Sequence, residues 1–271
     1  MSFEKFVSAT FLLSFTFISG TQALLPSGAI VPLYIYPTDS TGGVCATWTT
    51  YLNSITDNPD LPFYLVINPD SGPGADATPS SDYTACLPTV LALGSNVKLI
   101  GYVLTGYGVG RSSTDVLADV ATYLNWPVSY RPTGIFFDET AATSEFLSQY
   151  TTYVNQVRTD IPSDSTVILN PGVNVADDSY FSIADFIVTV EDFYDDFSFP
   201  GSLVVNATEP ASQQAVILHD APSTLPAALI DAMTAAGIGA SFITSEPQAV
   251  AYNTTPPYWA SFAAELTASQ S

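Results

Sequence analysis

The chain has 271 residues, and its 26 Asp and Glu residues against 5 Lys and Arg give a formal net charge of −21. This surplus of negative charge repels nucleic acids and anionic membrane surfaces, so neither is expected as a partner. The surplus has two interpretations: it keeps a protein soluble in acidic surroundings, or it attracts a cationic partner. Composition alone favours the first.

The first 23 residues are predicted to form a secretory signal peptide. Lys5 precedes an apolar stretch at residues 6–18, and Thr21-Gln22-Ala23 is a small-residue cleavage site. A retained membrane anchor is the alternative. Cleavage would leave residues 24–271, close to the roughly 250 residues of a typical (β/α)8 barrel. We therefore expect one secreted, monomeric domain, extracellular or associated with the cell wall, without membrane contact after cleavage.

Eight short apolar runs follow in chain order, each rich in Val, Ile, Phe and Tyr and closed by turn or polar residues, as buried parallel strands are. They cover residues 30–37, 63–69, 98–105, 134–139, 165–171, 186–191, 214–220 and 237–244. Pro32 is awkward inside a central strand, so an alternative start for the first strand is Leu33.

Five of the connecting segments carry apolar residues at three- and four-residue spacings, which predicts amphipathic helices. They are residues 48–56, 112–125, 144–158, 225–236 and 257–266. Residues 71–81 are rich in Gly, Pro, Asp and Ser and are expected to form a loop, and no helix can be placed between residues 191 and 214. The alternation predicts an α/β fold, a single-domain (β/α)8 TIM-type barrel. A doubly wound sheet is the competing fold.

The chain has two cysteines, Cys45 and Cys86. An even number in a secreted protein predicts one disulfide, here between the segments that follow the first and second strands. Two buried thiols are the alternative. Asn206-Ala-Thr and Asn253-Thr-Thr match the acceptor motif for N-glycosylation.

Several kinds of catalytic site are excluded by the sequence. His219 is the one histidine, so a zinc site with two or three imidazoles is impossible, and the cysteines lack CxxC spacing. No G-x-S-x-G motif is present. The glycines of residues 106–110 do not place a third glycine at the spacing of a dinucleotide loop, so the segment is interpreted as a turn. We expect neither a metal nor a cofactor.

Carboxylates at strand ends are the strongest catalytic candidates. Asp138 and Glu139 close the fourth apolar run, and Glu191 closes the sixth. An acid directly after buried residues is costly to desolvate unless it is paired or used. Barrel active sites lie at the carboxyl ends of the strands, and glycosidic hydrolysis needs two carboxyl groups. In a regular strand, however, neighbouring side chains face opposite ways.

Each of these acids also has a structural alternative. Asp138 or Glu139 could form an ion pair with Arg131 or Arg158, or cap the following helix, and Glu191 could begin a helix. Further strand-end residues are candidates for sugar binding, since tyrosine rings suit the apolar face of a sugar and amides bind hydroxyl or N-acetyl groups. They are Tyr36, Asp39, Asn68, Tyr107, Asn170, Tyr194 and His219. Packing or a turn is the alternative role for each.

Six segments of the chain resemble the spherulation-specific family 4 (spherulin 4) proteins, which are grouped as glycoside hydrolase family 135. These segments are VPLYIYP (31–37), INP (67–69), GYV (101–103), GIFFDE (134–139), LNPG (169–172) and VE (190–191). The resemblance implies a (β/α)8 barrel and endo-acting hydrolysis of α-1,4-linked N-acetylgalactosamine in galactosaminogalactan. That polysaccharide is partly deacetylated and cationic, which would give the negative charge a purpose.

The same resemblance implies that Asp138, Glu139 and Glu191 are the catalytic acids. We assign Glu191 as general acid/base and Asp138 as nucleophile or charge stabiliser, with Glu139 as the other candidate for that second role. The expected function is therefore a secreted glycoside hydrolase acting on a hexosamine-containing polysaccharide. The alternative is a cell-surface or cell-wall protein of the same family that binds glycan without cleaving it.

Overall fold

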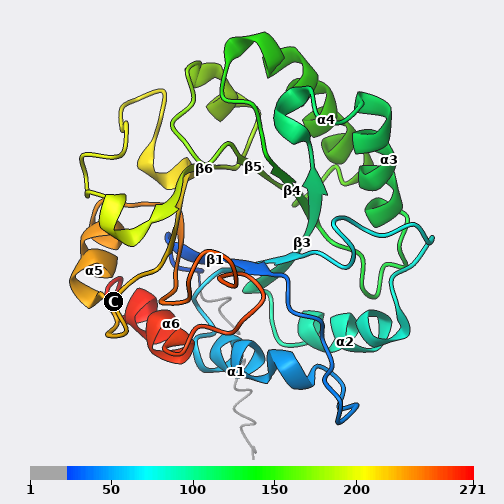
Figure 1. Cartoon of the computed structure of the whole chain (residues 1–271), viewed down its shortest axis with the longest axis horizontal. Helices are drawn as coiled ribbons and strands as arrows, with labels where there is room; N and C mark the ends of the chain where they lie inside the picture. The colour runs from blue at the N-terminus through cyan, green and yellow to red at the C-terminus, as the bar shows by residue number, and fades with distance from the viewer. Residues whose placement is uncertain (1–22) are drawn as a thin grey trace, which may run out of the picture.

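The computed structural model describes residues 23–271, so the predicted signal peptide, apart from its last residue, lies outside the described residues. Eight parallel strands close into a barrel, each paired with the next and β8 paired with β1 (Figure 1). They are β1 (Gly28–Leu33), β2 (Phe63–Ile67), β3 (Val97–Leu104), β4 (Gly134–Asp138), β5 (Thr166–Asn170), β6 (Phe186–Phe193), β7 (Gln214–His219) and β8 (Ala240–Ile243). The predicted single-domain (β/α)8 barrel is confirmed, and the doubly wound sheet is excluded.

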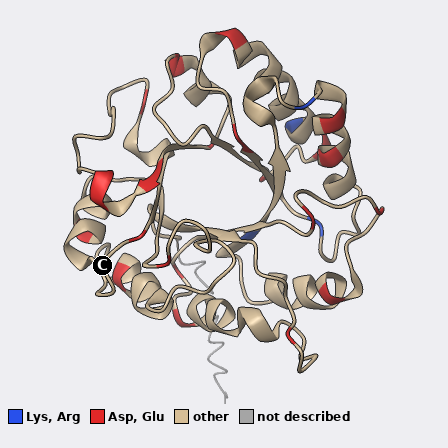
Figure 2. Ribbon diagram, viewed as in Figure 1, with Lys and Arg blue, Asp and Glu red and all other residues tan. Residues whose placement is uncertain are grey.

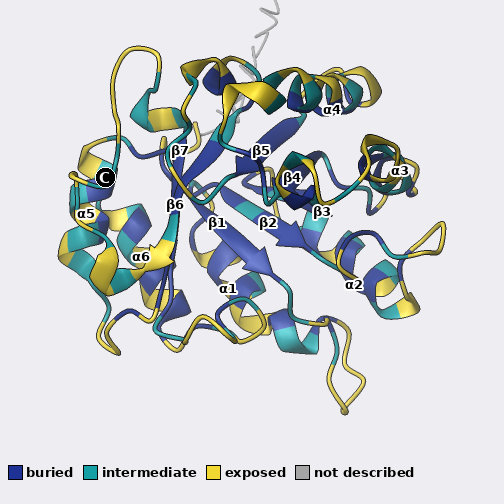
Figure 3. Ribbon diagram, turned by 45° about the horizontal axis from the view of Figure 1, so that its top comes forward, coloured by how far each residue is buried: buried dark blue, intermediate teal, exposed yellow. Residues whose placement is uncertain are grey.

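The strands are buried on both faces, which explains why the sequence shows continuous apolar runs instead of alternation. Every residue of β1, β5, β7 and β8 is buried. Figure 3 shows the strands as a largely buried centre, with exposed residues on the surrounding helices and loops and at the end of β6. This close-packed centre holds the strand ends, and hence the residues that follow them, in fixed relative positions.

Strand β1 tolerates a proline in its interior. The structure contradicts the alternative start at Leu33, because β1 begins at Gly28 and contains Pro32. The N–H of Ala29 bonds towards β2, so by strand alternation position 32 faces β8. The ladder between β1 and β8 ends at Ala29. Position 32 therefore has no partner on β8, and the absence of a backbone N–H on proline costs no hydrogen bond between strands.

Helices surround the barrel (Figure 1). They are α1 (Thr49–Asp57), α2 (Ser81–Leu91), α3 (Ser113–Leu124), α4 (Leu147–Asp160), α5 (Ala227–Ala235) and α6 (Trp259–Ala268). Five of these occupy predicted segments, whereas α2 was not predicted. Its buried residues Tyr83, Cys86, Leu87 and Val90 have helical spacing, but Pro88 interrupts the pattern. Short 3-10 turns, and no α-helix, connect β5 to β6 and β6 to β7 among the described residues.

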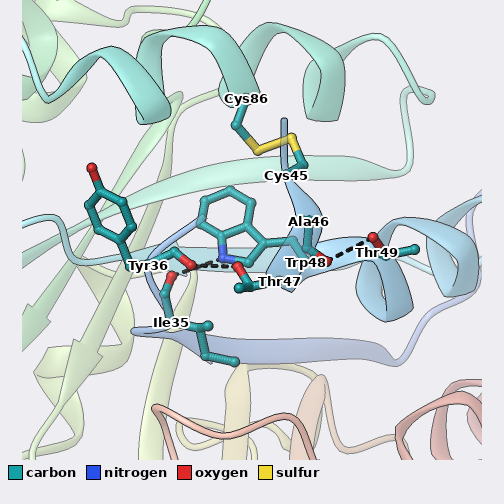
Figure 4. Close-up of a disulfide and its surroundings, with 8 residues drawn as sticks. All are labelled: Ile35, Tyr36, Cys45, Ala46, Thr47, Trp48, Thr49 and Cys86. Atoms are coloured by element: carbon teal, nitrogen blue, oxygen red, sulfur yellow. Dashed lines mark hydrogen bonds between the residues drawn. A yellow bond between two sulfur atoms is a disulfide. The ribbon is translucent and has the colours of Figure 1, made fainter. Parts of the chain in front are cut away.

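A disulfide joins Cys45 to Cys86 and confirms the predicted pairing. Figure 4 shows that it ties the segment before α1 to helix α2, so it braces the loops that follow β1 and β2. In residues 23–271 the helices are all too short, or insufficiently apolar, to span a bilayer.

Candidate active site

Two carboxylates from different strands are held by one amide at the carboxyl end of the barrel. The Nδ2 of Asn170 donates to Asp138 Oδ1 at 2.7 Å and to Glu191 Oε2 at 2.6 Å. These two oxygens are therefore no farther apart than the sum of the two bonds, about 5.3 Å. Within residues 23–271 the buried Oδ1 of Asn170 accepts no hydrogen bond, so the amide is held in the site by what its Nδ2 donates to the two acids.

Strand register and a bulge place these three residues. Asp138, the last residue of β4, pairs in register with Asn170, the last residue of β5. Gly172 then turns the chain with a φ of 68°, and its carbonyl accepts the backbone N–H of Glu191 at 3.0 Å. A register shift between Val188 and Val190 interrupts β6 immediately before Glu191. Such bulges re-aim the side chain that follows them.

Tyrosine hydroxyls hold the remaining carboxylate oxygens. Tyr102 donates to Asp138 Oδ2 at 2.7 Å, and Tyr252 donates to Glu191 Oε1 at 2.6 Å. The ring of Tyr34 lies edge-on to both tyrosines, with centroid distances of 5.4 Å to Tyr102 and 5.8 Å to Tyr252. Burial, and then the nearby carboxylates, raise the pKa of all three hydroxyls well above the usual range. All three hydroxyls therefore stay protonated, and those of Tyr102 and Tyr252 donate to the acids.

Asp138 is the acid whose ionisation the site perturbs. Burial, followed by the negative charge of Glu191, raises its pKa above the ordinary value. Hydrogen bonds from Tyr102, the backbone N–H of Glu139 and Asn170 oppose this rise. The site therefore favours the protonated form of Asp138 more than water does, and the negative charge of Glu191 contributes to this.

Backbone strain lets Asp138 and Glu139 line the same pocket. Glu139 follows the end of β4 with a φ of 50°, which breaks the strand alternation. Its carbonyl accepts the N–H of Tyr107 at 2.6 Å and the hydroxyl of Thr105 at 2.8 Å. Tyr107 also has a left-handed φ, of 53°. Non-glycine residues in this region cost about 1–3 kcal/mol and cluster at functional sites.

The pocket above these acids has a volume of about 330 Å³. Its lining consists of Tyr107, Asp138, Glu139, Asn170, Pro171, Gly172, Val173, Glu191 and Gln248. None of these residues is Lys or Arg. Arg158 pairs with Asp185, and Arg131 bonds the Leu124 carbonyl, so neither arginine neutralises the pocket acids as the structural alternative required. Figure 2 shows how sparsely positive residues are spread over the fold.

The loop after β8 supplies one wall of the pocket and is anchored on Asp220. That carboxylate accepts the backbone N–H of Gln248 at 2.9 Å, and the Asp220 N–H donates to the Glu246 carbonyl at 3.0 Å. His219 Nδ1 lies 2.9 Å from the same carboxylate oxygen. The anchored loop carries Gln248 to the pocket lining and Tyr252 to Glu191.

The structure gathers some of the predicted site residues and separates others. All three proposed acids line the pocket, together with Tyr107 and Asn170. Outside it lie Tyr36, in a second pocket; Asp39, bonded to Thr41; Asn68, whose amide oxygen caps Gly72; Tyr194; and His219, buried beside Asp220. In residues 23–271, His, Cys, Asp and Glu side chains form no cluster suited to a metal ion.

Sequence analysis missed Tyr102, Tyr252 and Gln248. A signal existed for Tyr102, since it lies two residues before the end of β3 and a polar group there can reach the carboxyl end of the barrel. Tyr252 and Gln248 lie in an irregular loop after β8. No periodicity marks which loop residues turn inward, so only the folded chain reveals them.

Comparison with known proteins agrees with the fold. The sequence model of spherulation-specific family 4 matches residues 28–266. Spherulin-4 of Physarum polycephalum is 34% identical over 180 residues, which cover 66% of this chain and 49% of that protein. The chain thus spans about half the length of this relative. The crystal structure of Aspergillus clavatus Sph3 in complex with GalNAc is similar, with 28% identity, a TM-score of 0.78 and coverage of 90% of this chain and 98% of that one.

Proposed function

Given that the chain belongs to spherulation-specific family 4, we propose that it is an endo-acting glycoside hydrolase of a hexosamine-containing polysaccharide. Its fold is glycosidase-like, and its similarity to a GalNAc-bound protein supports a glycan-related function. The finer proposal is cleavage of α-1,4-linked N-acetylgalactosamine in a galactosaminogalactan-type polymer. The observation that carries it is the pair of carboxylates, Asp138 and Glu191, joined by the Asn170 amide.

The two acids take different roles in the proposed reaction. Glu191 protonates the oxygen of the leaving sugar, and Asp138 attacks the anomeric carbon or stabilises its positive charge. When Glu191 is neutral, one of the two causes that raise the pKa of Asp138 is absent while its three hydrogen-bond donors remain, so the ionised form of Asp138 becomes more favourable, with burial still opposing it.

The spacing of the acids favours retention of the anomeric configuration. Retaining glycosidases hold their carboxyl groups about 5–5.5 Å apart, whereas inverting enzymes need about 6.5–9.5 Å to admit a water molecule. Asp138 Oδ1 and Glu191 Oε2, the two oxygens that the Asn170 amide joins, lie at most about 5.3 Å apart, below the range of inverting enzymes. We propose a covalent glycosyl intermediate on Asp138, which the first-formed anomer, followed by proton NMR, would test. An inverted first product would exclude it.

The charge of the pocket supports a cationic or neutral sugar chain as the substrate. Three acidic residues and no basic residue line it. A partly deacetylated hexosamine polymer carries ammonium groups, which such a pocket attracts. An acidic polysaccharide would be repelled.

The decisive test is the release of reducing ends from purified galactosaminogalactan, with Glu191→Gln and Asp138→Asn beside the unaltered protein. We expect release by the unaltered protein and a loss of at least 100-fold in each variant, since each removes a group needed in the transition state. Retention of the polymer without release by any of the three proteins would instead identify a non-catalytic glycan-binding protein.

We also propose that the protein is secreted and glycosylated at Asn206 and Asn253. The Cys45–Cys86 disulfide supports this, because disulfides persist in oxidising compartments. Both asparagines are exposed, and the Thr208 hydroxyl bonds Asn206 Oδ1 at 2.9 Å. A mobility shift of the secreted protein on deglycosylation would test it; protein retained in the cell and unshifted would count against it.

A further inference from the structure

A second pocket, of about 310 Å³, lies between the loops that follow β1 and β2. Its lining consists of Tyr36, Pro69, Asp70, Pro73, Gly74, Ala75, Asp76, Thr78, Pro79, Ser80 and Tyr83. It shares no residue with the pocket around Asp138 and Glu191. Both pockets are built from segments at the carboxyl ends of the strands, so they open on the same face of the barrel.

The side chain of Tyr36 is exposed and yet fixed in this pocket. Its hydroxyl donates to Asp82 at 2.7 Å and lies 2.8 Å from the hydroxyl of Ser80. Its ring meets Tyr83 edge-on at 5.5 Å, and Tyr83 in turn packs against Trp48. The residue is nevertheless 45% exposed. An immobilised, solvent-facing aromatic ring binds the apolar face of a sugar without an entropy cost for ordering it.

The surroundings of Tyr36 are equally rigid. The indole N–H of Trp48 donates to the carbonyl of Ile35 at 2.8 Å, and Thr47 donates its hydroxyl to the carbonyl of Tyr36. Figure 4 shows these contacts beside the disulfide that joins the segment before α1 to helix α2. Prolines supply three of the lining residues and have little freedom to lose. The pocket is therefore preformed, as carbohydrate sites and other small-molecule sites usually are.

The charge of the pocket indicates which sugar it takes. Asp70 and Asp76 are exposed in its lining, and neither carboxylate has an ion-pair partner in residues 23–271. The lining contains no Lys or Arg. An ammonium group on the sugar would supply the missing positive charge, whereas a uronic acid would be repelled.

We propose that this pocket is a distal subsite that binds a hexosamine unit carrying a free amine, on the same polymer that is cleaved beside Asp138. The aromatic ring of Tyr36 packs on the sugar, and Asp70 and Asp76 pair with its ammonium group. This proposal rests on the proposed function, because it assigns the second unit to the same chain of sugars. It makes the protein favour partly deacetylated stretches over fully acetylated ones.

Binding can be measured apart from cleavage in the Glu191→Gln background. Calorimetry would use α-1,4-linked galactosamine oligomers and their fully N-acetylated counterparts as probes, with Tyr36→Ala, Asp70→Asn/Asp76→Asn and, as a matched control, Asp178→Asn, which removes an exposed carboxylate from another pocket. We expect Tyr36→Ala to weaken both probes about three- to tenfold. The double Asn variant should weaken only the amine probe, by a similar factor, and most strongly at low salt.

The two proposals fail in distinguishable ways. Equal affinity of the double Asn variant and Asp178→Asn for the amine probe would overturn the charge assignment, since Asn keeps the shape of Asp. Unchanged affinity in Tyr36→Ala, with its thermal unfolding also unchanged, would overturn the subsite. If binding depends on Tyr36 while the unaltered protein releases no reducing ends, the subsite stands and the hydrolase proposal falls.

Discussion

Removal of the Tyr102 hydroxyl should impair the reaction through Asp138 without disturbing the packing. In Tyr102→Phe the ring keeps its contacts with Tyr34 and with Phe136, whose ring it stacks at 6.4 Å. Only the hydrogen bond to Asp138 Oδ2, at 2.7 Å, disappears. That bond lowers the pKa of Asp138, so its loss lets burial and Glu191 raise the pKa further.

The size of the effect follows from the hydrogen bond. A hydrogen bond to a charged group contributes about 1.5–3 kcal/mol. If the hydrogen bond contributes all of this free energy to the ionised Asp138 of the transition state, its loss lowers kcat/KM roughly 10- to 150-fold. Asp138 must be ionised in the proposed reaction, so activity is lost as pH falls through its pKa. A raised pKa therefore moves the acidic limb of the rate profile to higher pH.

The assay is the pH dependence of kcat/KM for reducing-end release, beside Tyr123→Phe as control. Tyr123 is another buried tyrosine, and its hydroxyl donates to the Ile67 carbonyl at 3.2 Å, away from the acids. The control should lose some stability and leave the pH profile unmoved. If Tyr102→Phe matches Tyr123→Phe in rate and in the position of the acidic limb, the role assigned to Tyr102 is refuted.

Two further predictions concern the stability of the site. Because the folded pKa of Asp138 lies above the ordinary 3.8, its ionisation destabilises the fold as pH rises through that pKa. Asp138→Asn should therefore raise the unfolding free energy by about 0.5–2 kcal/mol at neutral pH and by nothing well below the ordinary pKa of 3.8, in denaturant titrations at both pH values. An equal gain at both would contradict this. Glu139→Gly should be about 1 kcal/mol more stable than Glu139→Gln, because glycine adopts a φ of 50° without strain. Equal melting temperatures of the two variants would exclude backbone strain at this position.

The barrel was predictable because its strands are buried on both faces, and such strands have continuous apolar runs in the sequence. Asp138, Glu139 and Glu191 were predictable for the same reason, because charged residues directly after a buried apolar run are unusual. The helix α2 was not, because Pro88 and the loop before it masked its spacing.

The cooperation between the acids could not be read from the sequence. Asn170 was a candidate for binding sugar, and nothing in an Asn-Pro pair indicates that its amide spans two carboxylates. Likewise, the left-handed backbone of Glu139 depends on hydrogen bonds from the segment after β3. Such features arise from strand register and loop closure, which are properties of the assembled barrel.

The amide of Asn170 gives β5 an unexpected importance, since this strand contributes no acid and yet lies between the two that do. The distance between the carboxylates of Asp138 and Glu191 depends on the uncharged side chain of Asn170, which bonds both. A longer or shorter residue at position 170 would change that distance although the residues at positions 138 and 191 were unchanged. The stereochemical outcome of sugar cleavage would then be inherited through a neutral residue, and could change in evolution without any substitution of the acids themselves.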